Sequence, residues 1–431
     1  MPAHTPIPDI PGERLQNPET KYHLASRVSQ LCGLNSPDKF PGSQPVSFST
    51  ASLDLLEKKD FWVCEKSDGV RVLVFIVING FSGVQETWLI DRKQEFYNVK
   101  GLMFPKWDDR RQPLGESILD GELVIDVDPV TNKQRLRFYG FDCLVLNGEN
   151  IMSKNLEKRY ARLRDWVVVP LEKHIRDNPE AKQYLPFEVL AKREDLSYHL
   201  KYVMKEHIPK LQHGHDGLIF TCVQTPYIMG TDENILKWKP PSENSIDFRI
   251  ELRFPPIHDS DEPDYHAKPE FCLHTWLGSE RYEFFDFMEM TDEEWESWKE
   301  SGKPLDDRIV EVTWDGAMQA WRMMRIRDDK LHGNHKSIVE KILVSINDGV
   351  EIEELYARSD AIKSAWKSRA AHPQTPAVQR APPPQQHQPH GHGYGGGAGD
   401  YGGGDHAGGY GQGHGYGQGQ APQGVVAGLK R

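Results

Sequence analysis

Residues 61–78 read FWVCEKSDGVRVLVFIVI, two runs of β-branched and aromatic residues separated by Ser67-Asp68-Gly69. These residue types favour strands and Asp-Gly favours turns, so the segment predicts two strands with a turn between them. The Asn79-Gly80 pair that follows is a hairpin signal. Lys66 ends the first run and Arg71 begins the second, so both cations are expected beside the turn. Taken alone, the pattern also fits an ordinary hairpin with exposed charges.

Similar charged junctions recur further along the chain. Asp120-Gly121-Glu122 and Asp216-Gly217 each place carboxylates where a turn meets a strand-like run. Lys237 and Lys239 lie two residues apart in one such run and are therefore expected on the same face of a strand. The segment RIRDDK at 325–330 adds further cations. Cations that neutralise phosphate oxygens, with carboxylates that hold a hard metal ion, suit a nucleoside triphosphate with Mg²⁺.

Hydrophobic periodicity divides the chain into an α+β part and a later β-rich part. Up to Pro240-Pro241, strand-like runs alternate with helical spacing such as that at 156–167. Beyond this dipeptide, many short strands predict a small barrel or sandwich, closed by helical patterns at 334–347 and 351–368. The expected parts are an N-terminal extension at 1–44, an α+β domain at 45–241, a β-barrel domain with closing helices at 242–370, and a tail at 371–431. The tail is rich in Pro, Gln, Gly, His and Tyr and is expected to be disordered, because it cannot bury enough apolar surface.

Composition limits the functions that the chain can have. Lys and Arg number 52 against 64 Asp and Glu, which gives a formal net charge of −12. This balance argues against a protein that coats nucleic acid non-specifically, so any polyanion must meet a local basic site. No apolar run approaches the roughly 20 residues that span a bilayer, and the N-terminus lacks the apolar core of a secretory signal. The five cysteines form no C-x-x-C pair, so neither a zinc site nor a disulfide framework is expected.

The ordered set of motifs resembles the covalent nucleotidyltransferase superfamily of messenger-RNA capping enzymes and ATP-dependent ligases. The pattern of that superfamily is K-x-D-G-x-R, D-G-E, an aromatic F-D box, D/E-G, K-x-K and R-x-D-K. All six motifs occur in order between Lys66 and Lys330, and the aromatic box holds Phe141 and Asp142. Ligases usually carry Glu-Gly where this chain has Asp216-Gly217, and LKWKP is similar to the guanylyltransferase form of the fifth motif. The resemblance covers roughly residues 45–370 and is strongest to capping-enzyme guanylyltransferases of the fungal type.

This resemblance implies a fold and a reaction. The fold is a nucleotidyltransferase domain of ATP-grasp-like antiparallel sheets with helices, followed by an OB-fold barrel. In the reaction, Lys66 attacks the α-phosphorus of GTP, releases pyrophosphate and holds GMP as a phosphoamide. GMP then passes to the 5′-diphosphate end of RNA and forms the GpppN cap. The amine of Lys66 must be neutral to react, and the charges of Lys237, Lys239 and Arg71 would favour the neutral form.

The resemblance also assigns the residues of the site. Lys66 is the catalytic residue, and the residues expected to bind GTP come from both domains: Arg71, Glu122, Phe141, Asp216, Lys237, Lys239, Arg327, Asp329 and Lys330. Asp216, with Glu122, is the expected ligand of Mg²⁺ or Mn²⁺. Phe141 is expected to stack on guanine, although a plain core role fits the same residue. Asp142 fits a structural role equally well, and nothing in these motifs explains how guanine is distinguished from adenine.

Partners and location follow from the same resemblance. The expected partners are GTP, 5′-diphosphate RNA, a separate RNA 5′-triphosphatase (β) subunit and the phosphorylated C-terminal domain of RNA polymerase II. The sequence lacks the H-C-x₅-R signature of a cysteine phosphatase, so triphosphatase activity is not expected in this chain. A nuclear protein without a membrane segment is expected. Two alternatives stay open: an ATP-dependent polynucleotide ligase, and an inactive scaffold that binds RNA or polymerase.

Overall fold

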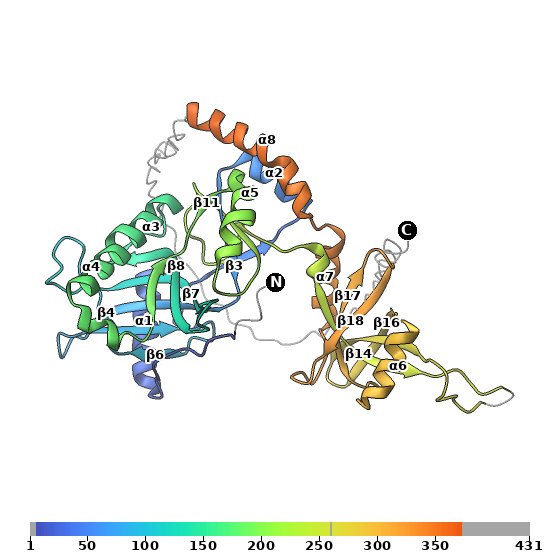
Figure 1. Cartoon of the computed structure of the whole chain (residues 1–431). Helices are drawn as coiled ribbons and strands as arrows, with labels where there is room; N and C mark the ends of the chain where they lie inside the picture. The colour runs from blue at the N-terminus through green and yellow to red at the C-terminus, as the bar shows by residue number, and fades with distance from the viewer. Residues whose placement is uncertain (1–5, 259–260, 373–431) are drawn as a thin grey trace, which may run out of the picture. The chain divides into compact units, whose positions relative to one another are not determined.

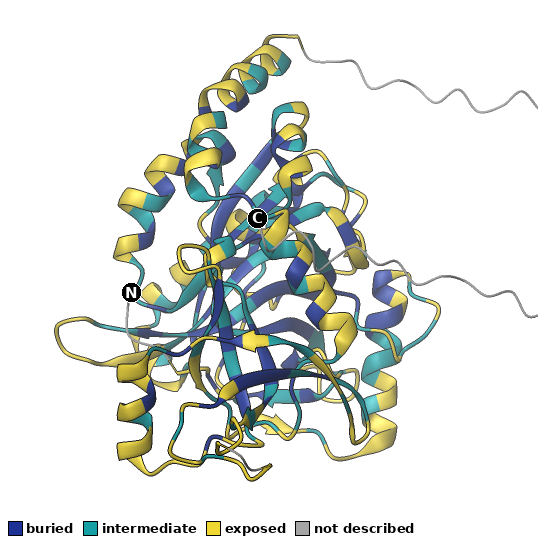
Figure 2. Cartoon of the chain, turned by 90° about the vertical axis from the view of Figure 1, so that its right-hand side faces the viewer, coloured by how far each residue is buried: buried dark blue, intermediate teal, exposed yellow. Residues whose placement is uncertain are grey.

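The structure, a computed structural model, describes residues 6–258 and 261–372 (Figure 1). The tail expected to be disordered lies outside the described residues from position 373 onward. Within the described ranges, every helix is too short or too polar to cross a membrane. Figure 2 shows that the strands are largely buried, whereas the helices each expose one face.

The first sheet has eight strands in the order β1-β6-β5-β4-β7-β8-β10, with β9 paired to β8. Strand β10 runs parallel to β8, and the other pairs are antiparallel. The hairpin expected after residue 78 is present, because β4 pairs with β5. The strands are β1 (Glu13–Arg14), β4 (Val70–Ile78), β5 (Gln85–Ile90), β6 (Phe96–Val99), β7 (Ser117–Val127), β8 (Gln134–Leu146), β9 (Glu149–Asn150) and β10 (Glu188–Ala191).

Helices cover both faces of this sheet (Figure 1). On one face, Leu163, Val167 and Leu171 pack with Val72 and Leu123. They belong to a helical segment formed by α3 (Leu156–Arg162), the π-helix η1 (Leu163–Val168) and α4 (Val169–Asp177), followed by the 3₁₀ helix η2 (Pro179–Tyr184).

The opposite face is covered by α1 (Pro18–Cys32), a helix that the sequence did not predict. The side chain of Asn17 caps its first turn by accepting a hydrogen bond from the backbone of Thr20, and Gly33, at φ 74°, ends it. Only its last turns are apolar, where Val28 and Leu31 pack with buried residues of β4. The polar first turns hide the helical periodicity, so this element could not be found by a hydrophobic pattern.

The second sheet has the order β11-β3-β12-β13-β2, in which only β13 and β2 are parallel. Its strands are β2 (Ser43–Ser47), β3 (Phe61–Ser67), β11 (Asp195–Leu196), β12 (His215–Cys222) and β13 (Gly230–Trp238). The strands β3 and β4 therefore belong to different sheets. The alternative interpretation of residues 61–78 as an ordinary hairpin is wrong. Gly69 makes this crossing possible, since a Cβ there would lie 2.3 Å from the carbonyl oxygen of Leu123 on β7. The turn after Lys66 carries the chain from one sheet into the other.

Short helices pack against the second sheet. Their apolar residues, including Leu56 and Val203, form a core with Phe61, Phe220 and Trp238 of the strands. The helices are α2 (Thr50–Lys58), η3 (Ser197–His199), α5 (Leu200–Tyr202), the π-helix η4 (Val203–His207) and η5 (Ile208–Lys210).

A closed five-stranded barrel follows, with the order β14-β15-β16-β18-β17. Phe248 on β14 and Trp321 on β18 are fully buried inside it. The barrel elements are η6 (Pro241–Glu243), β14 (Ser245–Arg253), β15 (Glu270–Gly278), β16 (Arg281–Met288), α6 (Asp292–Ser301), β17 (Ile309–Asp315), β18 (Ala320–Ile326) and α7 (Lys336–Asn347). An α+β domain followed by an OB-type barrel is thus confirmed.

The last helix, α8 (Ile352–Ala371), packs on the second sheet and its helices, although the sequence grouped it with the barrel. Leu355 and Ile362 join the core around Leu56 and Phe61. The indole of Trp238 donates a hydrogen bond of 2.7 Å to the carbonyl oxygen of Val350, just before this helix. The chain that leaves the α+β domain after β13 therefore returns to it beside the same strand.

This packing makes α8 part of the stability of the α+β domain. Leu355→Ala should lower the free energy of unfolding by about 2–5 kcal/mol, because it leaves a cavity in that core. Urea unfolding followed by tryptophan fluorescence measures this change. Lys367→Ala, on the exposed side of the same helix, should change it by less than about 0.5 kcal/mol. Equal stability of wild type and Leu355→Ala would contradict the packing.

Candidate functional site

Three charged side chains meet where β3, β12 and β13 lie side by side. Lys66 lies near the end of β3, Asp216 near the start of β12, and Lys239 directly after β13. One oxygen of Asp216 lies 2.5 Å from Nζ of Lys66, and the other lies 2.5 Å from Nζ of Lys239. About a third of each side chain is exposed, so this triad is open to a ligand. The structure thus brings together three of the residues that the motifs identified.

The backbone at Gly217 explains why Asp216 reaches both lysines. The pairing of β12 with β3 is irregular between His215 and Leu218, and Gly217 has a φ of 146°. A Cβ at this position would lie 2.0 Å from the carbonyl oxygen of Trp238. Only glycine allows β12 to approach β13 this closely, so the D-G motif has a conformational reason as well as a chemical one.

The electrostatics of the site follow from these contacts. Burial raises the pKa of Asp216, but the charge of Lys66 and the hydrogen bonds from both lysines outweigh it, so the pKa is lowered overall. Burial lowers the pKa of Lys237, and repulsion from Lys66 and Lys239 lowers it further. The site is therefore a cluster of cations around one ionised carboxylate, which suits a polyanionic ligand.

A cleft of about 510 Å³ opens on this cluster. Lys66, Lys237 and Lys239 line it, together with Lys341 and Ser345 of α7. Lys341 is exposed and was not predicted as a site residue. Lys341 lies on a helix and belongs to none of the motifs, so the sequence did not indicate that it lines this cleft. Only the tertiary fold brings α7 to the site.

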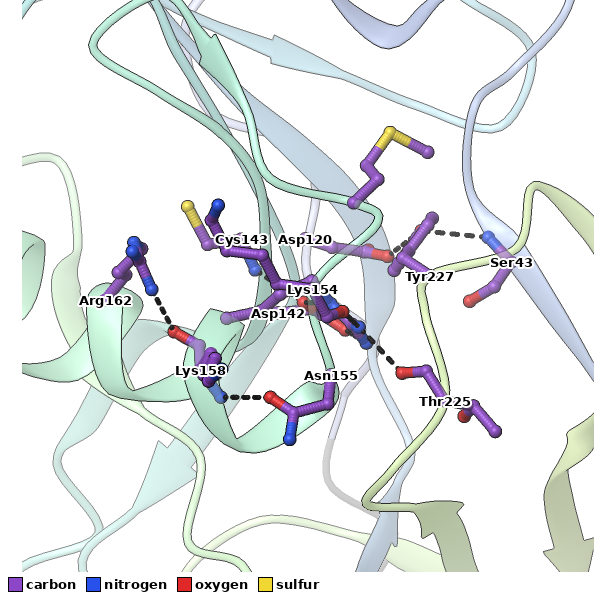
Figure 3. Close-up of polar contacts among 12 residues, drawn as sticks. Ser43, Asp120, Asp142, Cys143, Lys154, Asn155, Lys158, Arg162, Thr225 and Tyr227 are labelled. Atoms are coloured by element: carbon purple, nitrogen blue, oxygen red, sulfur yellow. Dashed lines mark hydrogen bonds and ion pairs between the residues drawn. The ribbon is translucent and has the colours of Figure 1, made fainter. Parts of the chain in front are cut away.

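Arg71 is held in a buried network rather than presented to the cleft. Its guanidinium donates hydrogen bonds of 3.0 and 2.6 Å to Asp120 and a further one to the carbonyl oxygen of Ser43. Tyr227 bridges the same groups, since its hydroxyl donates to Asp120 and accepts from the amide of Ser43 (Figure 3). The guanidinium also lies 5.5 Å from the ring centre of Phe141. The structure thus places Arg71 beside Phe141, and contact of either residue with a nucleotide stays a prediction.

The neighbour of Phe141 has a structural partner. Asp142 is buried and accepts two hydrogen bonds, of 2.8 and 2.9 Å, from Arg159. Figure 3 shows Asp142 beside the segment that carries Lys154 and Lys158. This pair ties β8 to α3 and favours the structural role of Asp142.

A buried lysine that the sequence did not single out lies behind the site. Nζ of Lys192 donates a hydrogen bond to the hydroxyl of Ser67 and lies 3.4 Å from Glu65 and 4.0 Å from Glu122. Burial raises the pKa of Glu122, and the charges of Lys192 and Lys66 only partly oppose that shift. Lys192 directly follows strand β10, just as Lys66 stands near the end of β3, and that lysine at a strand end was the available signal.

His213 joins the two sheets behind Lys66. Its Nδ1 lies 2.7 Å from Asp126 on β7, and its Nε2 lies 3.4 Å from Glu65 on β3. Burial lowers the pKa of His213, but its hydrogen bonds to the two carboxylates outweigh that effect and raise it above the ordinary value of 6.5. Carboxylates thus lie against both ring nitrogens of His213.

The raised pKa of His213 predicts a pH-dependent contribution to stability. Protonated His213 stabilises the fold fully below its unfolded pKa of about 6.5, and this contribution is lost as the pH rises through the raised folded value. The difference in unfolding free energy between wild type and His213→Gln should therefore shrink as the pH increases above 6.5. Urea unfolding between pH 6 and 9 measures it. A difference that grows with pH would show that His213 is held in the neutral form.

The charged residues of the R-x-D-K motif pair with carboxylates of the barrel domain itself. Nη1 of Arg327 lies 3.0 Å from Asp247, and Nη2 lies 2.8 Å from Asp329. Lys330 also pairs with Asp247. Among the described residues, no hydrogen bond or ion pair joins this motif to Lys66, Lys237 or Lys239. The structure therefore does not bring the fifth and sixth motifs together.

The residues of the site suit a metal ion that binds together with the nucleotide. They do not form a site that would hold a metal ion permanently. Within 6–258 and 261–372, no group of three or more His, Cys, Asp or Glu side chains could hold a metal ion. Mg²⁺ is commonly held by one or two protein carboxylates together with substrate phosphates and water. Asp216 and Glu122 could supply such carboxylates, but both oxygens of Asp216 are engaged by lysines here.

Comparison with known proteins agrees with this architecture. The family model described as mRNA capping enzyme, catalytic domain, matches residues 7–241, and the model for the C-terminal domain matches residues 243–356. The chain belongs to the mRNA capping enzyme family. This confirms the resemblance found in the motifs.

Curated relatives of this capping-family protein are similar over most of their length. The mRNA-capping enzyme subunit alpha of Schizosaccharomyces pombe is 41% identical, covering 84% of this chain and 89% of the relative. The subunit of the same name in Neurospora crassa is 38% identical, with 85% and 95% covered. That of Saccharomyces cerevisiae is also 38% identical, with 85% and 88% covered.

Proposed function

We propose that this capping-family protein is an mRNA guanylyltransferase, which transfers GMP from GTP to the 5′-diphosphate end of nascent mRNA. The transfer proceeds through a covalent lysyl-N-GMP intermediate and forms the GpppN cap. The observation that carries this proposal is the cleft in which Lys66 stands among Lys237, Lys239 and Lys341. A cleft lined by charges of one sign attracts a polyanion such as a triphosphate.

The proposed reaction uses these side chains in two steps. In the first step, the amine of Lys66 forms an N–P bond with the α-phosphate of GTP, and the bond to the pyrophosphate oxygen breaks. Lys237 and Lys239 would stabilise the negative charge of the transferring phosphoryl group. In the second step, a terminal oxygen of the RNA 5′-diphosphate attacks the same phosphorus, and Lys66 leaves as the amine.

The ion pair with Asp216 has to change before the first step. A nucleophilic amine requires a free electron pair, whereas Lys66 is in contact with a carboxylate 2.5 Å away. Binding of GTP with Mg²⁺ or Mn²⁺ would offer Asp216 a competing cation, and the lysines would turn to the phosphates instead. The metal supplies charge neutralisation of the triphosphate when it is bound. Glu122 and Asp216 are the residues proposed to meet it.

The expected partners are part of the same proposal. Relatives named as subunit alpha imply a second subunit. We assign to it the RNA 5′-triphosphatase activity that makes the 5′-diphosphate end. The phosphorylated C-terminal domain of RNA polymerase II would bring the protein to nascent transcripts in the nucleus.

The covalent step is tested directly with α-labelled GTP. Incubation with Mg²⁺ and a denaturing gel should show a labelled, acid-labile band that ATP does not give. Lys66→Ala and Lys66→Arg should both abolish the band, because a guanidinium stays protonated and cannot supply the electron pair. Labelling with ATP would favour a polynucleotide ligase. The absence of any label with either nucleotide would favour an inactive scaffold. Label mapped to another residue would overturn the assignment of Lys66.

The R-x-D-K motif generates a second test. We propose that the barrel acts as a lid, in which Arg327 and Lys330 contact the β- and γ-phosphates of GTP together with Asp329, and that it reopens after pyrophosphate leaves. Arg327→Ala and Lys330→Ala should therefore reduce adduct formation by at least about 100-fold, the scale of a lost charge contact to the transition state. Transfer from a pre-formed adduct to RNA should change far less.

The control for this test is Arg325→Ala, near the end of β18 and just before the R-x-D-K motif. Arg325 is exposed, and among the described residues its ion pair is with Glu311 in the barrel, so both half-reactions should keep their rates. Equal losses in the two half-reactions of the Arg327 and Lys330 variants would contradict the lid.

A further inference from the structure

A second groove, of about 440 Å³, lies between α1 and the turn from β5 to β6. Its lining combines the cations Lys21, Arg92 and Lys93 with the aromatic side chains of Tyr22 and Phe40. We call these five residues the α1 groove. Tyr22 is 61% exposed although it lies on a helix that covers the sheet. The groove therefore presents an exposed aromatic ring beside cations.

The charges of the α1 groove are only partly neutralised. Lys21 pairs with Glu95 at 2.9 Å. Arg92 and Lys93 are exposed, and neither forms an ion pair within the described ranges. Asp38 is the one carboxylate in the lining. The groove therefore carries net positive charge on a protein whose formal charge is −12.

One contact and one electrostatic effect link the α1 groove to the candidate site. The ring centre of Phe40 lies 6.0 Å from the guanidinium carbon of Arg71, which itself lies 5.5 Å from Phe141. The charge of Arg92 also reaches Lys237, since it contributes to lowering the pKa of that lysine after burial, Lys66 and Lys239. A chain whose end sits at Lys66 would thus find positive charge and aromatic surface on leaving the cleft.

We infer that the α1 groove binds the first nucleotides of the acceptor RNA, with phosphates on Lys93 and Lys21 and a base stacked on Tyr22. This inference rests on the proposed function, because it assumes that the 5′-diphosphate of RNA reacts at Lys66. Single-stranded nucleic acid is commonly held in this way, by a positively charged track with aromatic side chains for its bases. An acidic phosphopeptide could use the same cations and rings. RNA is favoured because Phe40 lies beside Arg71 and Phe141, close to where the 5′ end of the acceptor is proposed to react.

The test separates the two half-reactions in the full-length protein. The double variant Tyr22→Ala/Lys93→Ala should form the GMP adduct at the wild-type rate. Transfer from the adduct to a 20-nucleotide 5′-diphosphate RNA should require about tenfold more RNA for half-maximal rate, the scale expected for one lost stacking contact and one lost phosphate contact. Transfer to GDP, an acceptor with no RNA body, should be unchanged.

Two control variants accompany it. Lys182→Ala/Tyr184→Ala removes the same residue types from another exposed surface, the 3₁₀ helix η2, and should behave as wild type. Lys158→Ala/Arg162→Ala removes charge from a second basic groove, which Lys154, Lys158 and Arg162 line. That variant should also leave the RNA requirement unchanged.

Several results would overturn the inference. These are an unchanged RNA requirement in the Tyr22/Lys93 variant, an equal loss with GDP, or a larger loss in the Lys158/Arg162 variant. Loss of phosphoserine-peptide binding without loss of RNA transfer would assign the α1 groove to a peptide. Fluorescence anisotropy with the same RNA measures binding without any chemistry. If wild type formed no adduct, the proposed function would fail, while weaker RNA binding by the Tyr22/Lys93 variant would still support the groove.

Discussion

One carboxylate between two ammonium groups, Asp216 with Lys66 and Lys239, is the interaction on which the site depends. Without it, three lysines from adjoining strands would repel one another in a half-buried cleft. The protein holds them together because Gly217 lets β12 press against β13 and turns the carboxylate toward both. The arrangement is stable without a ligand and yet leaves its cations ready for a stronger anion.

Buried charges behind this cleft fix the strand that carries Lys66. Glu65 lies on the opposite face of β3 and meets both Lys192 and His213. His213 continues to Asp126 of the other sheet, so the two sheets are joined by charged hydrogen bonds as well as by apolar packing. Removing one partner from such a network leaves a buried charge unpaired, which is costly. The strand that carries Lys66 is therefore held from behind by Glu65, Lys192 and His213.

The sequence predicted the parts of the site that lie at strand ends. Lys66, Asp216 and Lys239 were found because a charged residue at a turn-to-strand junction is visible in a local pattern, and the fold brings those junctions together. The sequence could not show that β3 and β4 belong to different sheets. A hairpin and a crossing between two sheets have the same pattern of residues in the two strands. Lys341 was missed because only tertiary packing brings it to the cleft. Lys192 directly follows a strand, but that local signal belongs to none of the six motifs. The helix α1 was missed because its apolar surface is confined to its last turns, and α8 was assigned to the wrong neighbour because its amphipathic pattern does not say which core it covers.

The hydrogen bond from Trp238 to Val350 has a consequence for the architecture as a whole. The chain leaves the α+β domain after Trp238 and returns to it at Val350, beside the same strand. The barrel therefore lies between two parts of that domain, and α8 completes the core of the second sheet. In topological terms the barrel is an insertion, and the α+β core is discontinuous in sequence. During synthesis, the ribosome therefore completes the barrel before it makes α8, the last helix of the α+β domain. The ends of the inserted barrel thus lie beside one another, joined by the hydrogen bond from Trp238 to Val350.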